Sequence, residues 1–402
     1  MRGLQRHRGI FGAVSGKSVD VESELLMEII VTDTHTRMAL AVVRELGAFG
    51  YDVTSVTREG FPSLGHASRY AKRCVTLSNE TYADDLLMLS KPGKNVLLPT
   101  GMYSLTQIAE RHEAFSSAFF GLFSPKEVLH GAEDKPTVAK IAKELGLRVP
   151  ETYAPDAPRF PCVLKYRNGE KLRLRPEQRY AIVQNQAQYE KAFSAMKARG
   201  SAAGIDSSAC EIFVSEYIPG EAYGVSAVLD QNAEPLSLFC HLRMREYPIS
   251  GGPACLAQAV WHPKLIEAAV TLLKALGLRG FAMVEFKGTP ERPYILEVNP
   301  RIWGTYPLSR LCGAGMANAY VQGALGNTPG LITEQPPPWT GLRMQYLVND
   351  MANLVSCLRN RTRPSGNPLW DMLSPRTKGG VFDRKDLPGS FAYFRSLFRK
   401  MT

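Results

Sequence analysis

The sequence predicts an α/β protein with a parallel sheet in its N-terminal part and a mixed sheet after it. Short β-rich runs alternate with helical patterns up to about residue 118, which is the order of βαβ units. From residue 161 the chain changes to closely spaced short strands. Two later strands, Phe281–Gly288 and Pro293–Arg301, are joined by a short turn as in a β-hairpin. A chain of 402 residues is long enough to form two or three units of this kind.

The composition excludes several classes of protein. With 45% hydrophobic and 21% charged residues, the chain is typical of globular rather than disordered proteins. No apolar run approaches the roughly 18 to 20 residues that a membrane-spanning helix needs. Seven cysteines without a CxxC pair favour a reducing compartment, which we take to be the cytoplasm, over a disulfide framework or a structural zinc site.

The first unit is expected to cover residues 26–118, after a flexible basic tail over residues 1–25. Its strands are predicted at Met27–Asp33, Tyr51–Thr57 and Asn95–Thr100, with a helix after the first. This order is Rossmann-like. However, the turn after the first strand contains TDTHTRM instead of GxGxxG, which argues against dinucleotide binding.

A second domain is expected over residues 119–334, with a smaller subdomain at about 159–218. A helix is predicted over Lys135–Leu145 because its apolar residues have helical spacing, and Gly146 follows it. The proline-rich run Gln335–Trp339 is expected to be a linker to a basic extension over residues 335–402. The end of this extension is predicted either to pack on its own domain or to form an amphipathic helix at a membrane surface.

The hairpin carries the residues with the clearest chemical meaning. Glu297 and Asn299 are two residues apart on one strand and therefore share a face. Glu285 lies on the partner strand, and pairing of the two strands brings it close to them. Two carboxylates and an amide oxygen suit Mg²⁺, which prefers oxygen ligands and keeps substrate phosphates in its shell. The alternative is a set of ordinary acids on an exposed strand.

The two hairpin strands, FAMVEFK and ILEVNPR, resemble the metal-binding signature of the ATP-grasp superfamily, which includes biotin carboxylase, carbamoyl phosphate synthetase and D-alanine–D-alanine ligase. Three further segments match in the same order: DKPTVAKIAKELGLRVPET, PCVLKYR and SEYIPGEAYGVSAV. The segment LRMREYPISGGPACL resembles a predicted carboxylate–amine ligase branch. The resemblance covers residues from about 125 to 320, and it implies an ATP-grasp fold with a small lid and a larger mixed-sheet domain.

The resemblance also implies which residues bind the nucleotide. Lys135 and Lys165 would contact the phosphates of ATP, and Glu221 would accept from the ribose hydroxyls, although superfamily members more often have this acid one residue later. The adenine hinge would be formed by Glu216, Tyr217 and Ile218. The loop RNGEKLRLRPEQR has one glycine, so Lys171 or Arg173 is expected to replace the usual glycine-rich cover of the phosphates.

The metal and the reacting groups follow from the same resemblance. Glu285, Glu297 and Asn299 would hold one or two Mg²⁺ ions, with Mn²⁺ as an alternative, and Arg301 would stabilise an acyl phosphate or an oxyanion. Two more arginines, Arg243 and Arg245, lie two residues apart on a strand and are expected to share a face. Arg245 is favoured as the substrate-side residue because it precedes the turn EYPISGG. Ordinary salt bridges or solvated charges are the alternatives for these arginines.

The expected activity is ligation. A substrate carboxylate attacks the γ-phosphate of ATP, and an amine then attacks the acyl phosphate and releases phosphate. The substrates are small molecules expected in the cleft between the N-terminal and hairpin domains. Three alternatives stay open: an acceptor other than an amine, a non-catalytic ATP sensor, and nucleic-acid binding. The last is suggested only by the positive net charge and is not expected. A homodimer is suggested only by analogy with the superfamily.

Overall fold

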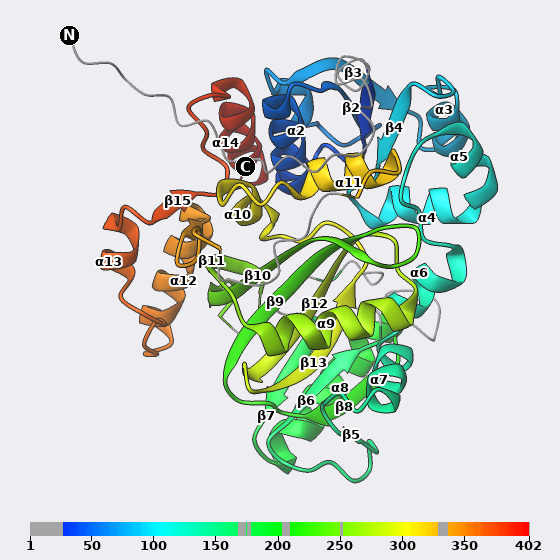
Figure 1. Ribbon diagram of the computed structural model, residues 1–402. Helices are drawn as coiled ribbons and strands as arrows, with labels where there is room; N and C mark the ends of the chain where they lie inside the picture. Colours follow the sequence, from blue (N-terminus) through cyan, green and yellow to red (C-terminus); the bar gives the residue numbers. More distant parts are fainter. Residues whose placement is uncertain are drawn as a thin grey trace.

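The computed structural model describes residues 27–167, 174, 178–202, 210–249, 252–328 and 337–401. The described residues form three sheets (Figure 1). The predicted α/β class, with a parallel N-terminal sheet and a larger mixed sheet, is confirmed. The expected tail and the lid residues Lys171 and Arg173 lie outside the described residues.

The N-terminal sheet has the strand order β3-β2-β1-β4 and is parallel throughout. Its strands are β1 (Glu28–Val31), β2 (Asp52–Arg58), β3 (Ala71–Leu77) and β4 (Asn95–Leu98). Its helical segments are α2 (Arg37–Phe49), η1 (Gly65–Ala67), α3 (Tyr82–Leu87), α4 (Met102–Glu110) and α5 (His112–Ala118). Thr36 caps the start of α2 by accepting a hydrogen bond from the Ala39 amide at 3.2 Å, and Gly50 ends the helix in the left-handed conformation.

The central sheet has seven strands in the order β13-β12-β9-β10-β11-β14-β15. They are β9 (Glu221–Leu229), β10 (Pro235–Glu246), β11 (Ala254–Val260), β12 (Gly280–Thr289), β13 (Arg292–Asn299), β14 (Arg343–Gln345) and β15 (Thr377–Gly379). The antiparallel pairing of β12 with β13 confirms the predicted hairpin. The stretch after residue 335 supplies β14 and β15, so it is part of this sheet.

A separate four-stranded sheet has the order β5-β8-β6-β7 and lies mostly in the expected lid subdomain, so it is called the lid sheet below. Its elements are β5 (Thr152–Tyr153), β6 (Cys162–Tyr166), β7 (Tyr180–Val183), α8 (Gln186–Ala202) and β8 (Ile212–Glu216). Before it come α6 (Lys126–Glu133) and α7 (Lys135–Glu144). The remaining helices are α9 (Pro263–Leu276), α10 (Tyr306–Leu311), α11 (Met316–Ala324), α12 (Leu347–Arg359), α13 (Pro368–Leu373) and α14 (Leu387–Met401). Among the described residues, none of these helices combines the length and apolarity needed to cross a bilayer.

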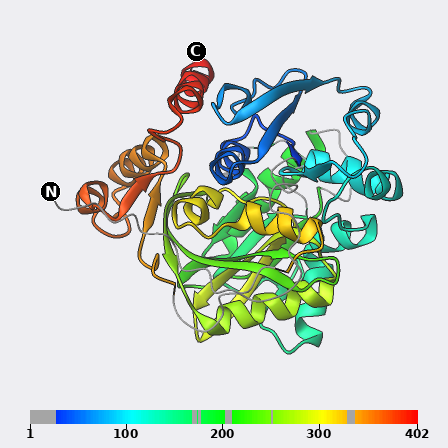
Figure 2. The same ribbon diagram turned by 45° about the horizontal axis from the view of Figure 1, so that its top comes forward.

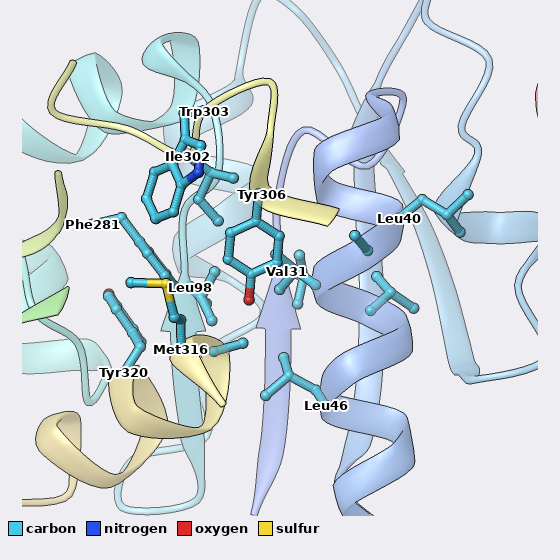
Figure 3. Close-up of a cluster of buried hydrophobic side chains, with 14 of the residues drawn as sticks. Val31, Leu40, Leu46, Leu98, Phe281, Ile302, Trp303, Tyr306, Met316 and Tyr320 are labelled. Atoms are coloured by element: carbon cyan, nitrogen blue, oxygen red, sulfur yellow. The ribbon is translucent and has the colours of Figure 1, made fainter. Parts of the chain in front are cut away.

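The largest core joins the N-terminal domain to the central sheet. Side chains from β1, α2 and β4 meet those of β12, α10 and α11 (Figure 3). Phe281 stacks on Tyr320 with ring centroids 5.2 Å apart. Glu45 of α2 is buried at the same seam, where it accepts hydrogen bonds from the Tyr306 hydroxyl at 2.8 Å and from the Ala317 amide at 2.7 Å. Because a carboxylate at a helix N-terminus satisfies otherwise unpaired amides, Glu45 ties α11 to the N-terminal domain.

The C-terminal helix α14 is held near the same domain. Arg44 of α2 donates from Nε to Asp386 Oδ2 at 2.7 Å and from Nη2 to Ser390 Oγ at 3.0 Å. Asp386 also accepts from Ser68 Oγ at 2.8 Å and from the Arg69 amide at 2.9 Å. In Figure 1 and Figure 2, α14 lies beside the N-terminal domain. The end of the C-terminal extension was predicted either to pack on its own domain or to lie at a membrane surface. Its first residues, Asp386 and Ser390, pack against the N-terminal domain.

Candidate functional site

The hairpin brings its three oxygen-bearing side chains together. Glu285 is directly opposite Glu297 in the strand register, and Met283 is opposite Asn299. The pairing shifts by one residue after Glu285, so the irregularity begins at the site itself. Asn299 Nδ2 lies 3.4 Å from Glu285 Oε1 and 3.4 Å from Glu297 Oε1. The amide thus bridges the two carboxylates.

Basic side chains from three other elements surround this cluster. Lys135, the first residue of α7, places Nζ 3.5 Å from Glu297 Oε2. Arg243 of β10 donates from Nη1 to Glu285 Oε2 at 2.9 Å. Lys165 of β6 and Arg301, which follows β13, are close enough to act electrostatically on Glu297. Cations and carboxylates converge here although they are far apart in the sequence, which is typical of a functional site.

The two carboxylates have opposite pKa shifts. Burial acts to raise the pKa of Glu297, but Lys135, Lys165 and Arg301 outweigh it, so the pKa lies below its usual value. Burial raises the pKa of Glu285, and repulsion from Glu297 adds to this, while Arg243 opposes it. Burial also lowers the pKa of Lys165, partly offset by attraction to Glu297. Of the two acids, Glu297 is therefore held more firmly in the charged form, which is the form that a metal ion would require.

The donor set fits a hard divalent cation. In the described part of the chain, no group of three or more His, Cys, Asp or Glu side chains is placed to hold a metal. The hairpin instead offers two carboxylates and the side-chain amide of Asn299. A half-turn flip of this amide, which exchanges Nδ2 and Oδ1, points its oxygen toward the acids. This set suits Mg²⁺, which takes few protein ligands and completes its shell with phosphate oxygens and water.

An open pocket lies against the hairpin. Lys135, Glu297 and Arg301 line it, and Met102 of α4 reaches it from the N-terminal domain. The pocket therefore lies where the N-terminal domain meets the hairpin, with the acids on one wall. Arg167 lines it as well, at the end of lid strand β6.

The expected adenine hinge links the lid sheet to the central sheet. Glu216 is the last residue of β8, and its amide donates to Glu151 O at 2.8 Å. The Tyr217 amide donates to Pro161 O at 3.4 Å, and Ile218 is buried. After Ile218 the chain passes Gly220, whose φ of 108° and close approach to the Gly288 carbonyl leave no room for a side chain. The segment is thus a tight crossing between two sheets.

Glu221, the expected ribose ligand, is the first residue of β9 and is exposed. Its carboxylate accepts a hydrogen bond from the Tyr223 hydroxyl. The structure places it on the strand that continues from the hinge, on the same chain segment as Ile218.

The structure does not bring Arg245 to this site, which corrects the prediction that it lies on the substrate side. Arg245 is 3% exposed. It forms a two-bonded ion pair with Asp350, at 2.7 Å from both Nε and Nη2, and a 2.5 Å contact with Asp371. The pairing of β10 with β11 is irregular between Arg243 and Arg245. This bulge breaks the alternation of side chains, so the two arginines do not share a face.

Three residues at or near the site were not predicted as ligands. One is Arg243, since the sequence favours Arg245 as the substrate-side residue. Arg167 lies two residues after Lys165 and pairs with Asp134 at 2.9 Å. Asp134 caps α7 by accepting from the Thr137 amide at 3.2 Å. Two sequence signals could have identified these residues: Asp134 directly precedes the predicted helix, as an N-cap does, and Arg167 is two residues after Lys165, as residues on one strand face are.

A buried histidine supports the sheet beneath the site. His241 of β10 is paired with Gly224 of β9, which is in turn paired with Glu285 of β12. The His241 ring covers Gly224 so closely that a Cβ there would lie 2.3 Å from it. His241 Nε2 lies 3.0 Å from Thr305 Oγ1, in the loop after β13. Burial, with a smaller contribution from Arg243, lowers the pKa of His241 to about 3, so the ring is neutral.

Comparisons with known proteins give a match for one segment of the sequence and for the fold. Residues 208–349 match a family described as ATP-grasp in the biosynthetic pathway with Ter operon. Biotin carboxylase from Campylobacter jejuni has a similar fold, with a TM-score of 0.59 and 16% identity over 76% of this chain and 72% of that chain.

Two further solved structures share the fold. Pyruvate carboxylase from Rhizobium etli has a TM-score of 0.55 and 16% identity over 74% of this chain and 28% of that chain. The biotin carboxylase domain of a thermophilic 2-oxoglutarate carboxylase has a TM-score of 0.53 and 14% identity over 75% of this chain and 69% of that chain. At such identities these likenesses show the fold alone. The chain therefore has a fold similar to that of biotin carboxylase, and its segment 208–349, which contains Glu285, Glu297 and Asn299, matches an ATP-grasp family.

Proposed function

We propose that this protein is an ATP-dependent ligase that phosphorylates a substrate carboxylate and couples the resulting acyl phosphate to an amine. The observation that carries the proposal is the meeting of Glu285, Glu297 and Asn299 beside Lys135 and other cations. Fixed charges of both signs at one pocket suit a reaction between two anions, ATP and a carboxylate.

Each group has a role in this proposal. Glu285, Glu297 and Asn299 would hold Mg²⁺, or Mn²⁺ in its place, which supplies positive charge beside the β and γ phosphates. Lys135 and Lys165 approach Glu297 from two different elements and would bind the phosphates from both sides. Glu216, Tyr217, Ile218 and Glu221 would hold the nucleoside.

Arg301 and Arg243 are assigned to the reacting carboxylate and its acyl phosphate. Arg301 lines the pocket, and Arg243 contacts the metal-binding acid Glu285 directly. A planar guanidinium can bind two oxygens of a carboxyl or phosphoryl group at once, which orients it for attack. The substrate carboxylate then attacks the γ-phosphorus, ADP leaves, and the amine displaces phosphate from the acyl carbon. We place this reaction in the cytoplasm, where ATP is available.

The test incubates the purified protein with MgATP and a metabolite extract and follows nucleotides and new masses by mass spectrometry. We expect ADP, phosphate and a product whose mass equals a carboxylic acid plus an amine minus water. Glu297→Gln should abolish all three because it removes the charge of the most strongly ionised metal ligand. Glu267→Gln, an exposed acid on α9, is the matched control and should leave turnover unchanged.

Other outcomes would separate the alternatives. AMP in place of ADP would exclude the acyl-phosphate route. ADP with an ester or thioester product would establish a non-amine acceptor. ATP binding without turnover in any extract would favour a nucleotide sensor.

A further inference from the structure

The C-terminal lobe is defined here as residues 346–380, with helices α12 and α13. Its helices bury polar side chains and expose apolar ones. The face of α12 that packs on the central sheet carries Asp350, Asn353 and Cys357, all buried. A second face, spaced at i, i+4, i+8 and i+11, carries the exposed residues Leu347, Met351, Val355 and Leu358. Since helices of globular proteins normally bury the apolar stripe, this arrangement leaves an apolar face in solvent.

The short helix α13 repeats the reversal. Asp371 is buried, whereas the neighbouring Trp370 and Leu373 are 71% and 72% exposed, and Met372 is exposed as well. Leu358, at the end of α12, is 79% exposed. Exposed apolar groups gathered over two adjacent helices exceed the scattered single residues that are normal on a protein surface.

Both acids of the lobe are used internally. Asp350 binds Arg245 through both carboxylate oxygens, and Asp371 binds Arg245 and Arg343, each at 2.5 Å. Neither arginine belongs to the lobe. Its negative charges are therefore neutralised by arginines of the central sheet, and they contribute nothing to the outer surface.

The remaining charges of the lobe are positive and exposed. Arg359, Arg361 and Arg363 follow Leu358 directly, and Arg376 and Lys378 follow α13. The lobe thus presents exposed apolar side chains bordered by basic ones, with no exposed acid among its residues. Figure 1 and Figure 2 both place α12 and α13 at the margin of the molecule away from α6 and α7, so the lobe and the hairpin pocket lie on opposite sides.

We propose that the C-terminal lobe docks on the surface of an anionic lipid membrane. Apolar side chains enter the headgroup region, and arginines around them meet lipid phosphates. A second copy of this chain fits less well, because pairing two such faces would bring basic residues together. A nucleic acid fits less well because its phosphates attract the arginines but offer nothing to the exposed leucines and methionines.

The test is co-sedimentation of the full chain with vesicles of phosphatidylcholine alone or mixed with phosphatidylglycerol. Binding is expected only to the mixed vesicles and should weaken as salt is added. Trp370 is the most exposed tryptophan and provides a second signal: its fluorescence should shift to the blue with mixed vesicles and become protected from acrylamide. Neither readout requires turnover of ATP, so this test is independent of the proposed activity.

Two pairs of variants separate the contributions. Arg361→Gln with Arg363→Gln should weaken binding by about 30-fold, the effect expected for two basic residues near an anionic surface. Leu358→Ser with Leu373→Ser should weaken it by roughly tenfold or more. Met88→Ser changes a side chain that is 82% exposed on the N-terminal domain, and it should leave binding unchanged. All variants change exposed residues, so thermal unfolding should match that of the parent protein.

The proposal is overturned if the parent protein ignores mixed vesicles, or if both double variants bind as it does. Equal binding to uncharged vesicles would also contradict it. A dimer in light scattering that both double variants disrupt, without vesicle binding, would assign the face to a second copy of the chain. Binding to DNA or RNA that depends on Arg361 and Arg363 in place of vesicle binding would assign it to nucleic acid.

Discussion

Arg243 and Arg245 show how much the role of one residue depends on local backbone geometry. Arg243 reaches Glu285 in the candidate metal site, while Arg245 is enclosed by Asp350 and Asp371. Only one residue separates them along β10, but the bulge between them reverses the alternation on which a strand-face prediction depends. One arginine serves the candidate site, and the other holds the C-terminal lobe.

The two arginines should respond differently to the same substitution. Arg243→Gln is expected to lower kcat by roughly 100-fold or more, the usual effect of removing a group that stabilises charge in a reaction. Arg245→Gln should cost about 3–5 kcal/mol of unfolding free energy, because it leaves buried carboxylates unpaired. Turnover and urea unfolding measured on both variants check this. Lost turnover with unchanged unfolding in the Arg245 variant would return that residue to the substrate side.

At the scale of elements, the hairpin and three of the four strands of the parallel sheet were predicted, because their patterns are local, whereas the edge strand β3 was missed. Strand alternation places Glu297 and Asn299 on one face, and a short turn fixes the partner strand that carries Glu285. The helix cap at Asp134 was also readable. The bulge in β10 was not, since no residue type marks it. Nor were β14 and β15, because strands of three residues exist only through pairing with distant partners.

His241 joins three elements, and its protonation should govern their packing. An unfolded histidine titrates near pH 6.5, whereas the pKa of His241 in the folded protein is about 3. Below pH 6.5 the unfolded chain therefore binds a proton that the folded chain does not, and stability falls as the pH decreases towards 3. From pH 7.5 to pH 5 this single group should cost about 2 kcal/mol.

Urea unfolding at these two pH values checks this, with His241→Gln expected to lose that part of the pH dependence. His130→Gln, at an exposed position of α6, is the control and should behave like the parent protein. An unchanged pH dependence in the His241 variant would show that other groups determine acid stability.

At the scale of the whole molecule, buried ionic contacts join parts that are far apart in the chain. Arg44 and Asp386 are 2% and 0% exposed in their side chains. Asp386 also receives hydrogen bonds from Ser68 and the Arg69 amide, so one carboxylate near the C-terminus completes the N-terminal domain. No local pattern predicts such a pair, because its partners lie 342 residues apart.

Asp386→Asn should destabilise the whole protein, since it leaves the Arg44 guanidinium buried without its counter-charge. The expected cost is about 3–5 kcal/mol, measured by denaturant unfolding. Asp84→Asn removes the partner of Arg111 in a solvent-exposed pair and should change little. Equal effects of the two substitutions would contradict a structural role for the buried pair.

The distance between Arg44 and Asp386 also has a consequence for synthesis on the ribosome. The N-terminal sheet and α2 emerge early, but the residue that neutralises Arg44 is added 342 residues later. At roughly 5–20 residues per second, the nascent domain spends about 20 to 70 seconds with an uncompensated guanidinium where its interior will form. During that interval Arg44 should remain hydrated, and this helix should reach its final packing only after translation is nearly complete.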